Sequence, residues 1–374
     1  MVRKTTTRLL LKGGYDEKLL IAYLVAVVAG MVLVYSTSSM LAESRFGSHL
    51  HFIGRQFVWA IISLAAIWLV CRIDLQRWAV WSWLLFVLTL GLLALVFLMP
   101  ARNGSHRWLF LGPLTLQPAE LFKFVMIYFL AFSLANRNRD VTKLKQVWMP
   151  YGPMLGAGLV LIVLEPDLGM SMVIFATAVG LFFLAGAKIK HIAYAALPAM
   201  GGAALLVFVI GYKKARVMDF LASVMDPLAG SYQSKQAALT LGAGGIFGVG
   251  LGDGRQKHFF LPYPHTDFIF AAAGEEIGLV GLLLLLSLLG FILYRGFKIA
   301  ADQPDRFGFL LASGVVLSLF INIAVNVAVV TSLMPVTGLP LPFISYGGSS
   351  LLITSITIGV LLNLSRRMVG RAKQ

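Results

Sequence analysis

The chain has 374 residues, of which 59% are hydrophobic and only 13% carry a charged side chain. A soluble domain usually has about 25% charged and about 45–50% apolar residues, so the composition excludes an ordinary soluble protein and indicates a polytopic membrane protein. The net charge of +15 would suit nucleic acid binding, but the placement of the basic residues excludes nucleic acid as an expected partner.

Ten apolar runs approach the ~20 residues that a membrane-spanning helix needs. They predict a single all-α membrane domain over residues 1–374 with about ten transmembrane helices. The pair flanking Glu165-Pro166-Asp167 could instead be one kinked element. The runs are 17–38, 53–71, 79–99, 118–134, 150–165, 168–185, 189–211, 267–294, 309–333 and 346–364.

Lysines and arginines concentrate in alternate connections, including a basic leader (1–16) and a basic tail (365–374). By the positive-inside rule, both termini are predicted to be cytoplasmic. The excess charge then serves topology and attraction to anionic lipid. The first run follows the leader without a small-residue cleavage site, which predicts a span rather than a cleaved signal peptide.

The connection 100–117 contains Arg107, and the fourth span opens with Glu120 and Lys123. These two residues are three apart, so they share a helix face and can pair. The pair could be structural and fix helix packing. Alternatively, Lys123 and Arg107 could share an anion such as the diphosphate of a lipid-linked substrate. The spacing leaves both interpretations open, and Glu165-Pro166-Asp167 could likewise be a turn or the edge of a site.

The longest loop, 212–266, lies between the seventh and eighth spans and is predicted to be extracytoplasmic. It contains Asp226-Pro227, Tyr232-Gln233 and the glycine-rich stretch 241–254. A loop of this length is usually functional or disordered, and its interleaved aromatic and apolar residues favour a packed, functional loop. The glycines do not form a phosphate-binding loop, because no helix beginning with Lys-Ser/Thr follows them.

The loop ends in His265-Thr266-Asp267, which places Asp267 at the mouth of a membrane helix. A partly desolvated aspartate has a raised pKa and can act as a general base. An aspartate at a helix start can equally be an N-cap. The residues alone favour neither the general base nor the N-cap. Glu275 and Glu276 lie deeper in the same span, where a carboxylate should face the bundle interior and have a partner.

Residues 334–352, MPVTGLPLPFISYGGSSLL, interrupt the last two spans with three prolines and paired glycines. Proline cannot continue a helix, and irregular backbone beside a membrane must be buried in protein or line a wet cavity. We therefore expect a shaped re-entrant loop. Asn322 and Asn326, four apart in the ninth span, are expected to join helices. Candidates for holding a sugar or diphosphate are Ser345, Tyr346, Gly347, Gly348, Ser349 and Ser350, with His265 and Thr266.

Metal and redox chemistry have no sequence signal. The six histidines show no metal-ligand spacing, and the single Cys71 allows no internal disulfide. We expect no protein-held cofactor, although a divalent cation could accompany a diphosphate.

Four segments, in order, carry a family resemblance: 104–123 (GSHRWLFLGPLTLQPAELFK), 164–169 (LEPDLG), 226–278 (DPLAGSYQ to AAAGEEIG) and 334–352. Together they resemble the SEDS family (shape, elongation, division and sporulation), which includes FtsW, RodA and SpoVE. The segments containing DP and YQ, and then PHTDFIFA, are more similar to the FtsW/SpoVE branch than to RodA.

The resemblance implies a GT-C-like peptidoglycan glycosyltransferase in the cytoplasmic membrane, with its active site facing outside. It implies polymerisation of lipid II, with the growing undecaprenyl-diphosphate glycan as donor, and maps the family's essential aspartate onto Asp267. The implied partners are a class B penicillin-binding transpeptidase and other division or elongation membrane proteins. Two other functions compete with it: a lipid II flippase, since broken helices also suit transporters, and a scaffold that only recruits such partners.

Overall fold

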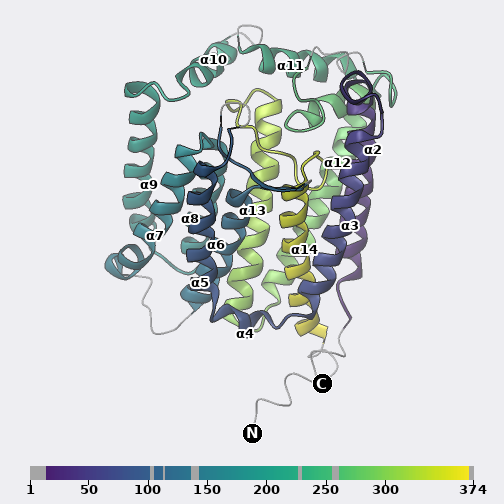
Figure 1. Ribbon diagram of the computed structural model, residues 1–374. Helices are drawn as coiled ribbons and strands as arrows, with labels where there is room; N and C mark the ends of the chain where they lie inside the picture. The colour runs from purple at the N-terminus through teal and green to yellow at the C-terminus, as the bar shows by residue number, and fades with distance from the viewer. Residues whose placement is uncertain are drawn as a thin grey trace.

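The computed structural model describes residues 14–101, 105–112, 114–135, 143–225, 230–254 and 261–369. Figure 1 shows a bundle of long helices, roughly side by side, with α10 and α11 lying across one end. Part of the predicted leader and tail, and the Asp226-Pro227 pair, lie outside the described residues.

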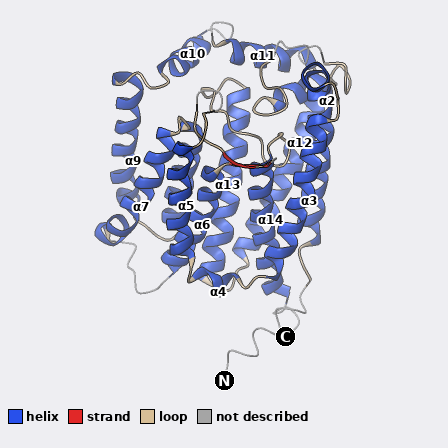
Figure 2. Ribbon diagram, viewed as in Figure 1, coloured by secondary structure: helices blue, strands red, loops and turns tan. Residues whose placement is uncertain are grey.

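The helices are α2 (Glu17–Phe46), α3 (His51–Arg72), α4 (Leu75–Ala79), α5 (Ser82–Leu95), α6 (Pro118–Ala135), α7 (Leu144–Leu164), α8 (Leu168–Leu184), α9 (Ile189–Ala204), α10 (Lys214–Met225), α11 (Tyr232–Gly244), α12 (Ile269–Ala301), α13 (Arg306–Val330) and α14 (Gly348–Val369). A short 3-10 turn, Val96–Leu98, extends α5, and a π-helical turn, Leu205–Val209, extends α9. The strands β1 (Leu109–Leu111) and β2 (Leu114–Leu116) form an antiparallel ribbon, which Figure 2 shows in red.

The ten predicted spans are confirmed as helices of a polytopic membrane protein. Among the described residues, seven helices are long and apolar enough to cross a membrane, and three shorter apolar helices, Ser82–Leu98, Tyr151–Leu164 and Leu168–Leu184, supply the rest. The span pair in doubt forms two helices, because the ring of Tyr151 near the start of α7 lies 5.6 Å from that of Phe182 near the end of α8. The helices α7 and α8 are therefore an antiparallel hairpin.

Burial differs sharply between helices. Most residues of α6 and α14 are buried, whereas the apolar stretch of α9 is not buried at all, as with the exposed Leu197 and Met200. Apolar side chains on the outside of a bundle are expected where lipid replaces water. The central helices α6, α13 and α14 therefore hold the core, and α9 lies at its edge (Figure 1).

Small residues allow the central helices to approach closely, as is usual in membrane proteins. A Cβ added at Gly348 would lie 2.1 Å from the Trp59 ring of α3, and one at Gly30 of α2 would lie 2.5 Å from the Phe343 carbonyl oxygen. The second contact presses α2 against the 334–347 loop. That loop is thus held inside the bundle, as predicted for a re-entrant segment.

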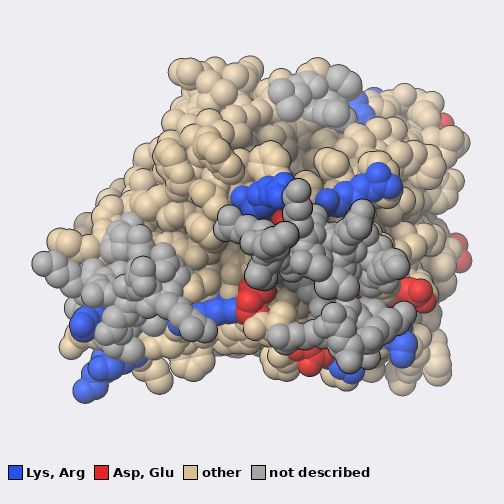
Figure 3. Space-filling model, turned by 90° about the horizontal axis from the view of Figure 1, so that it is seen from below, with Lys and Arg blue, Asp and Glu red and all other residues tan. Residues whose placement is uncertain are grey.

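Both described chain ends lie at the same end of the bundle (Figure 1). Asp16, the N-cap of α2, pairs with Arg295 of α12, and its backbone N–H donates to Ser365 Oγ at 3.1 Å. Arg366 donates to the Cys71 carbonyl at 3.0 Å. Figure 3, which views this end, shows groups of Lys and Arg side chains together with some Asp and Glu. The shared end agrees with the prediction that both termini lie on one side, while its cytoplasmic identity stays a prediction.

Helix α12 is broken rather than straight, which the sequence analysis did not predict. Gly278 has φ 66° and ψ −173°, a region open essentially to glycine. The glycine-rich segment after α11 bonds into the break: Val249 N–H donates to Glu275 O at 2.9 Å, and Leu279 N–H donates to Gly245 O at 3.0 Å. We call this arrangement, residues 245–250 bonded to 275–280, the glycine clasp. It fixes the first half of α12, which follows Asp267.

The two intramembrane glutamates lie beside the clasp. Both are buried, and Ser36 of α2 donates to the Glu276 carboxylate at 2.6 and 2.7 Å from its two oxygens. The expectation of an interior-facing, partnered carboxylate is therefore confirmed for Glu276.

The clasp gives a stability prediction. A Cβ at Gly278 would lie 2.3 Å from the Gly248 nitrogen, so Gly278→Ala should lower the free energy of unfolding by about 2 kcal/mol or more through strain and overpacking. Gly290→Ala, in the same helix with open space around it, is the control and should leave stability unchanged or slightly higher. Thermal melting in detergent measures both. Equal melting of Gly278→Ala and wild type would contradict the described clasp.

Candidate functional site

Several segments distant in sequence meet at the end of the bundle opposite the termini. They are the β1–β2 ribbon, the turn between α7 and α8, the start of α10, the residues before α12 and the 334–347 loop. Ionisable side chains gather there, and Asp267 is among them.

Asp267 is half-buried in a turn that precedes α12. Phe268, not Asp267, occupies the N-cap position of α12, so the N-cap interpretation of Asp267 is wrong. Asn326 of α13 donates from one amide to the carbonyls of Asp267 at 3.0 Å and Leu339 at 2.7 Å. That asparagine therefore ties the 334–347 loop to the Asp267 backbone, a more specific function than the predicted helix–helix contact.

The carboxylate of Asp267 faces the 336–339 segment, since a Cβ added at Gly338 would lie 3.6 Å from Asp267 Oδ2. Burial, and to a lesser extent the nearby charge of Asp167, raises the pKa of Asp267 to about 6, against the opposing effect of Arg107 and Arg216. At neutral pH this carboxylate is mostly ionised yet more basic than an ordinary aspartate. Those two properties suit a general base.

Arg107 binds the turn between α7 and α8 with its whole guanidinium. Its Nε donates to the Glu165 carbonyl at 3.0 Å, another N–H donates to the Pro166 carbonyl, and Nη1 lies 3.4 Å from Asp167 Oδ2. A planar fork of donors is the group that can make all three contacts at once. Glu165-Pro166-Asp167 therefore forms a turn that Arg107 holds in place. Its role as the edge of a site stays a prediction.

Asp167 has two structural contacts besides Arg107. Its Oδ1 accepts from Met170 N–H at 3.1 Å and caps α8, while Oδ2 accepts from Gln117 at 3.2 Å. Burial raises the pKa of Asp167, and Arg107 counteracts that rise. Burial together with the charge of Asp167 raises the pKa of Glu165 to about 8, with Arg107 opposing the shift, so Glu165 is largely neutral at pH 7.

Glu120 and Lys123 form the ion pair that their spacing allows. Lys123 Nζ lies 2.7 Å from Glu120 Oε2, with side chains only 5% and 2% exposed. The structural interpretation of the pair is supported. Direct binding of an anion by Lys123 would require the pair to open, so that role stays a prediction.

The 334–347 loop holds the backbone that leads into Asp267. Ser345 Oγ donates to the Thr266 carbonyl at 2.6 Å, and Tyr346 N–H donates to the His265 carbonyl at 2.8 Å. The buried His265 ring lies 4.6 Å from the Phe52 ring and 5.6 Å from the Tyr346 ring. Burial and the charge of Arg45 lower the pKa of His265 to about 4, so this histidine is neutral at physiological pH.

The remaining candidates of this loop have structural contacts at the start of α14. Ser349 Oγ donates to the Thr115 carbonyl at 2.6 Å and accepts from Gln117 N–H at 3.1 Å. Gly347 N–H donates to Gln56 at 3.3 Å, Gly348 rests on Trp59, and the Ser350 carbonyl accepts from Thr354 at 2.6 Å. Contact of Ser345–Ser350 with a sugar or diphosphate stays a prediction.

Sequence reasoning missed the residues at the start of α10. Tyr212 donates to the Val163 carbonyl at 2.6 Å, and Arg216 donates to the Val336 carbonyl at 3.1 Å. These bonds bring residues 212–216 beside the Arg107 turn and the Gly338 segment. The available signal was a cluster of three cations, Lys213, Lys214 and Arg216, on the side that otherwise has few basic residues.

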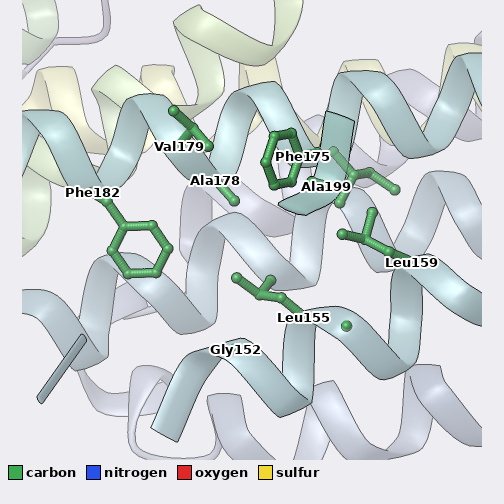
Figure 4. A pocket seen from close by; sticks show the side chains of 10 residues that line it. Gly152, Leu155, Leu159, Phe175, Ala178, Val179, Phe182 and Ala199 are labelled. Atoms are coloured by element: carbon green, nitrogen blue, oxygen red, sulfur yellow. The ribbon is translucent and has the colours of Figure 1, made fainter. Parts of the chain in front are cut away.

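Two further features bear on ligands. Among the described residues, no group of three or more His, Cys, Asp or Glu side chains is arranged to hold a metal ion. An apolar groove of about 190 Å³ lies between α7, α8 and α9, lined by residues that include Leu155, Phe175 and Ala199 (Figure 4). The apolar lining of this groove would suit a hydrocarbon chain, and the groove lies outside the cluster of ionisable side chains.

Residues 17–369 match the sequence profile of the FtsW/RodA/SpoVE family, described as cell cycle proteins. The chain is 39% identical over 359 residues to stage V sporulation protein E of Bacillus subtilis (strain 168), covering 95% of this chain and 98% of that protein. It is 38% identical over 362 residues to a probable peptidoglycan glycosyltransferase FtsW of Geobacter sp. (strain M18), covering 96% and 99%.

Solved structures show the same architecture. A chain of a peptidoglycan synthase complex, described as coordinating polymerization and crosslinking, superposes with a TM-score of 0.77 at 29% identity, covering 95% of this chain and 98% of that one. Rod shape determining protein RodA of Thermus thermophilus superposes with a TM-score of 0.70 at 29% identity, covering 95% and 97%.

The buried ion pair gives a second prediction. Glu120→Gln leaves Lys123 charged and unpaired, so it should cost about 3–5 kcal/mol of stability. Combining Glu120→Gln with Lys123→Met removes the charge and should restore most of the loss. Glu17→Gln removes an exposed carboxylate from another first helical turn and should change stability by less than about 0.5 kcal/mol. Thermal melting of wild type and the three variants measures these differences in stability. A Glu120→Gln variant as stable as Glu17→Gln would contradict the described ion pair.

Proposed function

The chain belongs to the cell cycle protein family of FtsW, RodA and SpoVE, and from this membership we propose that it is a peptidoglycan glycosyltransferase that polymerises lipid II into β-1,4-linked glycan strands. The observation that carries the proposal is Asp267: a half-buried carboxylate with a pKa of about 6, fixed by its backbone, at the end of the bundle where cations gather. The names of the similar FtsW proteins support the same activity.

The reaction assigns Asp267 one task. The 4-hydroxyl of the acceptor GlcNAc attacks the anomeric carbon of the donor glycan, and the α-linked undecaprenyl diphosphate leaves with the bonding electrons. A single in-line displacement inverts the centre and gives a β bond. Asp267 takes the hydroxyl proton as the new C–O bond forms, which requires its ionised form.

The departing diphosphate needs positive charge or N–H donors. Arg107 is proposed to supply it at the edge of the site, and a divalent cation arriving with the diphosphate is compatible with the same proposal. The apolar groove beside α9 supports a substrate with a long hydrocarbon chain.

We place the protein in the cytoplasmic membrane with the Asp267 site facing outward, because the basic connections predict the opposite end to be cytoplasmic. The proposed partner is a class B penicillin-binding transpeptidase, which the coordinated polymerization and crosslinking described for the similar synthase complex supports. The names of the FtsW and SpoVE relatives favour cell division or sporulation over elongation.

The flippase and the scaffold are less well supported. A transporter site is expected near the membrane midplane, whereas the ionisable cluster lies towards one end of the bundle. A protein that only recruits partners would not need an aspartate with a raised pKa beside several cations.

Polymerisation of purified lipid II by the protein with its cognate transpeptidase tests the proposal. Asp267→Asn should lower the rate by about a hundredfold or more, the usual contribution of a positioned base, with unchanged melting. The control is Asp253→Asn, which removes an exposed carboxylate from the same connection between α11 and α12. This variant should polymerise lipid II like wild type. Glycan made at the wild-type rate by Asp267→Asn would refute Asp267 as the base. Lipid II crossing liposome bilayers without glycan formation would favour the flippase.

The raised pKa gives a pH prediction. Since only the ionised carboxylate accepts the proton, kcat/KM should fall about tenfold per pH unit below pH 6 and level off above it. His265, with a pKa of about 4, does not titrate in that window. A rate that stays constant down to pH 5 would contradict the assignment.

A further inference from the structure

The two cations expected to bind the leaving diphosphate already have protein partners. Lys123 is paired with Glu120 inside the bundle, and each of the three guanidinium nitrogens of Arg107 contacts the α7–α8 turn. Lys123 can bind an anion only by opening its ion pair, and Arg107 has for an anion only the N–H donors that the turn leaves over. The leaving group therefore needs further cations besides Arg107.

We propose that Lys213, with Arg216 beside it, binds the diphosphate of the lipid substrate and stabilises it as it departs. This inference rests on the proposed function and names further binding residues for that reaction.

Geometry places Arg216, three residues after Lys213, against the same segment as the base. Arg216 Nη1 donates to the Val336 carbonyl at 3.1 Å, and Gly338, two residues on, adjoins the Asp267 carboxylate. A Cβ added at Gly169, just after Asp167, would lie 2.8 Å from Thr337 Cβ. The 336–339 segment is thus contacted from one side by α10, from another by α8 and from a third by Asp267.

Tyr212 fixes the position of Lys213 relative to the turn. Its hydroxyl donates to the Val163 carbonyl near the end of α7, so the next residue, Lys213, lies just before α10 and close to the turn that Arg107 contacts. Lys213 itself has φ 52°, a left-handed conformation that costs a non-glycine residue of order 1 kcal/mol or more. Glycine would adopt this backbone conformation at lower cost. We therefore infer that lysine occupies this position for its side chain.

The charges of the cluster are unbalanced in favour of an anion. Lys213, Arg216 and Arg107 interact, and burial together with the two arginines lowers the pKa of Lys213 to about 8, partly offset by Asp167. Glu165, largely neutral at pH 7, adds no compensating charge. The cluster then holds three cations, Lys213, Arg216 and Arg107, and the carboxyl groups of Asp167 and Asp267. A doubly charged diphosphate relieves the repulsion between the cations and takes charge-assisted hydrogen bonds from them.

The test separates binding from catalysis. In the Asp267→Asn background, which does not turn over, binding of undecaprenyl diphosphate to the full chain in nanodiscs is measured by tryptophan fluorescence, with undecaprenyl monophosphate as the comparison. Lys213→Gln and Arg216→Gln should each raise the Kd for the diphosphate about tenfold and that for the monophosphate less. Lys214→Gln, the exposed neighbour, should bind within twofold of its parent.

Lys213→Gly serves as a second variant, because it removes the ammonium while fitting the left-handed backbone, and it should show the same loss of affinity. In the active background, both Lys213 variants should lower kcat about tenfold at unchanged melting temperature. Diphosphate affinity equal to that of the parent in the Lys213 variants would overturn this inference. Failure of the wild-type protein to make any glycan from lipid II would instead overturn the proposed function, so the two failures are distinguishable.

Discussion

The site depends on one guanidinium. Arg107, carried by the short connection before β1, holds the α7–α8 turn through two carbonyls and one carboxylate. That contact sets where Asp167 lies, and Asp167 in turn places the start of α8 against the 336–339 segment that faces Asp267. The same pair of charges acts on the base in opposite directions, Asp167 raising its pKa and Arg107 lowering it. The contact between Arg107 and Asp167 therefore both fixes the α7–α8 turn and adjusts the pKa of Asp267.

Two irregular segments hold the base from the other sides. The 334–347 loop fastens the backbone of His265 and Thr266 by hydrogen bonds from Tyr346 and Ser345, and the glycine clasp fixes the first half of α12 by backbone bonds across its break. Both depend on close backbone approach, which side chains larger than hydrogen would prevent at Gly30, Gly248 and Gly278. A precise position for Asp267 is therefore built from bonds to the main chain, which leaves its carboxylate available for chemistry.

The sequence predicted what is encoded locally. Apolar runs located the ten spans, the spacing of Glu120 and Lys123 predicted their ion pair, and the prolines of 334–352 predicted a re-entrant loop. It could not predict the break at Gly278, because the residues that bond into it, 245–250, lie about thirty positions earlier in the chain, in the 212–266 loop. The N-cap alternative for Asp267 failed because the helix begins two residues later than the apolar run does. Lys213 and Arg216 were overlooked because the bond that brings Arg216 to the 336–339 segment joins residues more than a hundred positions apart in the chain.

The most direct test of this account is the pH–rate profile of Asp167→Asn measured beside wild type in lipid II polymerisation. Asparagine keeps the N-cap of α8 but removes the negative charge beside Asp267 and leaves Arg107 uncompensated, and both changes favour the ionised base. The account predicts an active enzyme whose acidic limb moves from about pH 6 to a lower pH. An unshifted limb, or one displaced to higher pH, would contradict the electrostatic connection between the clamp and the base.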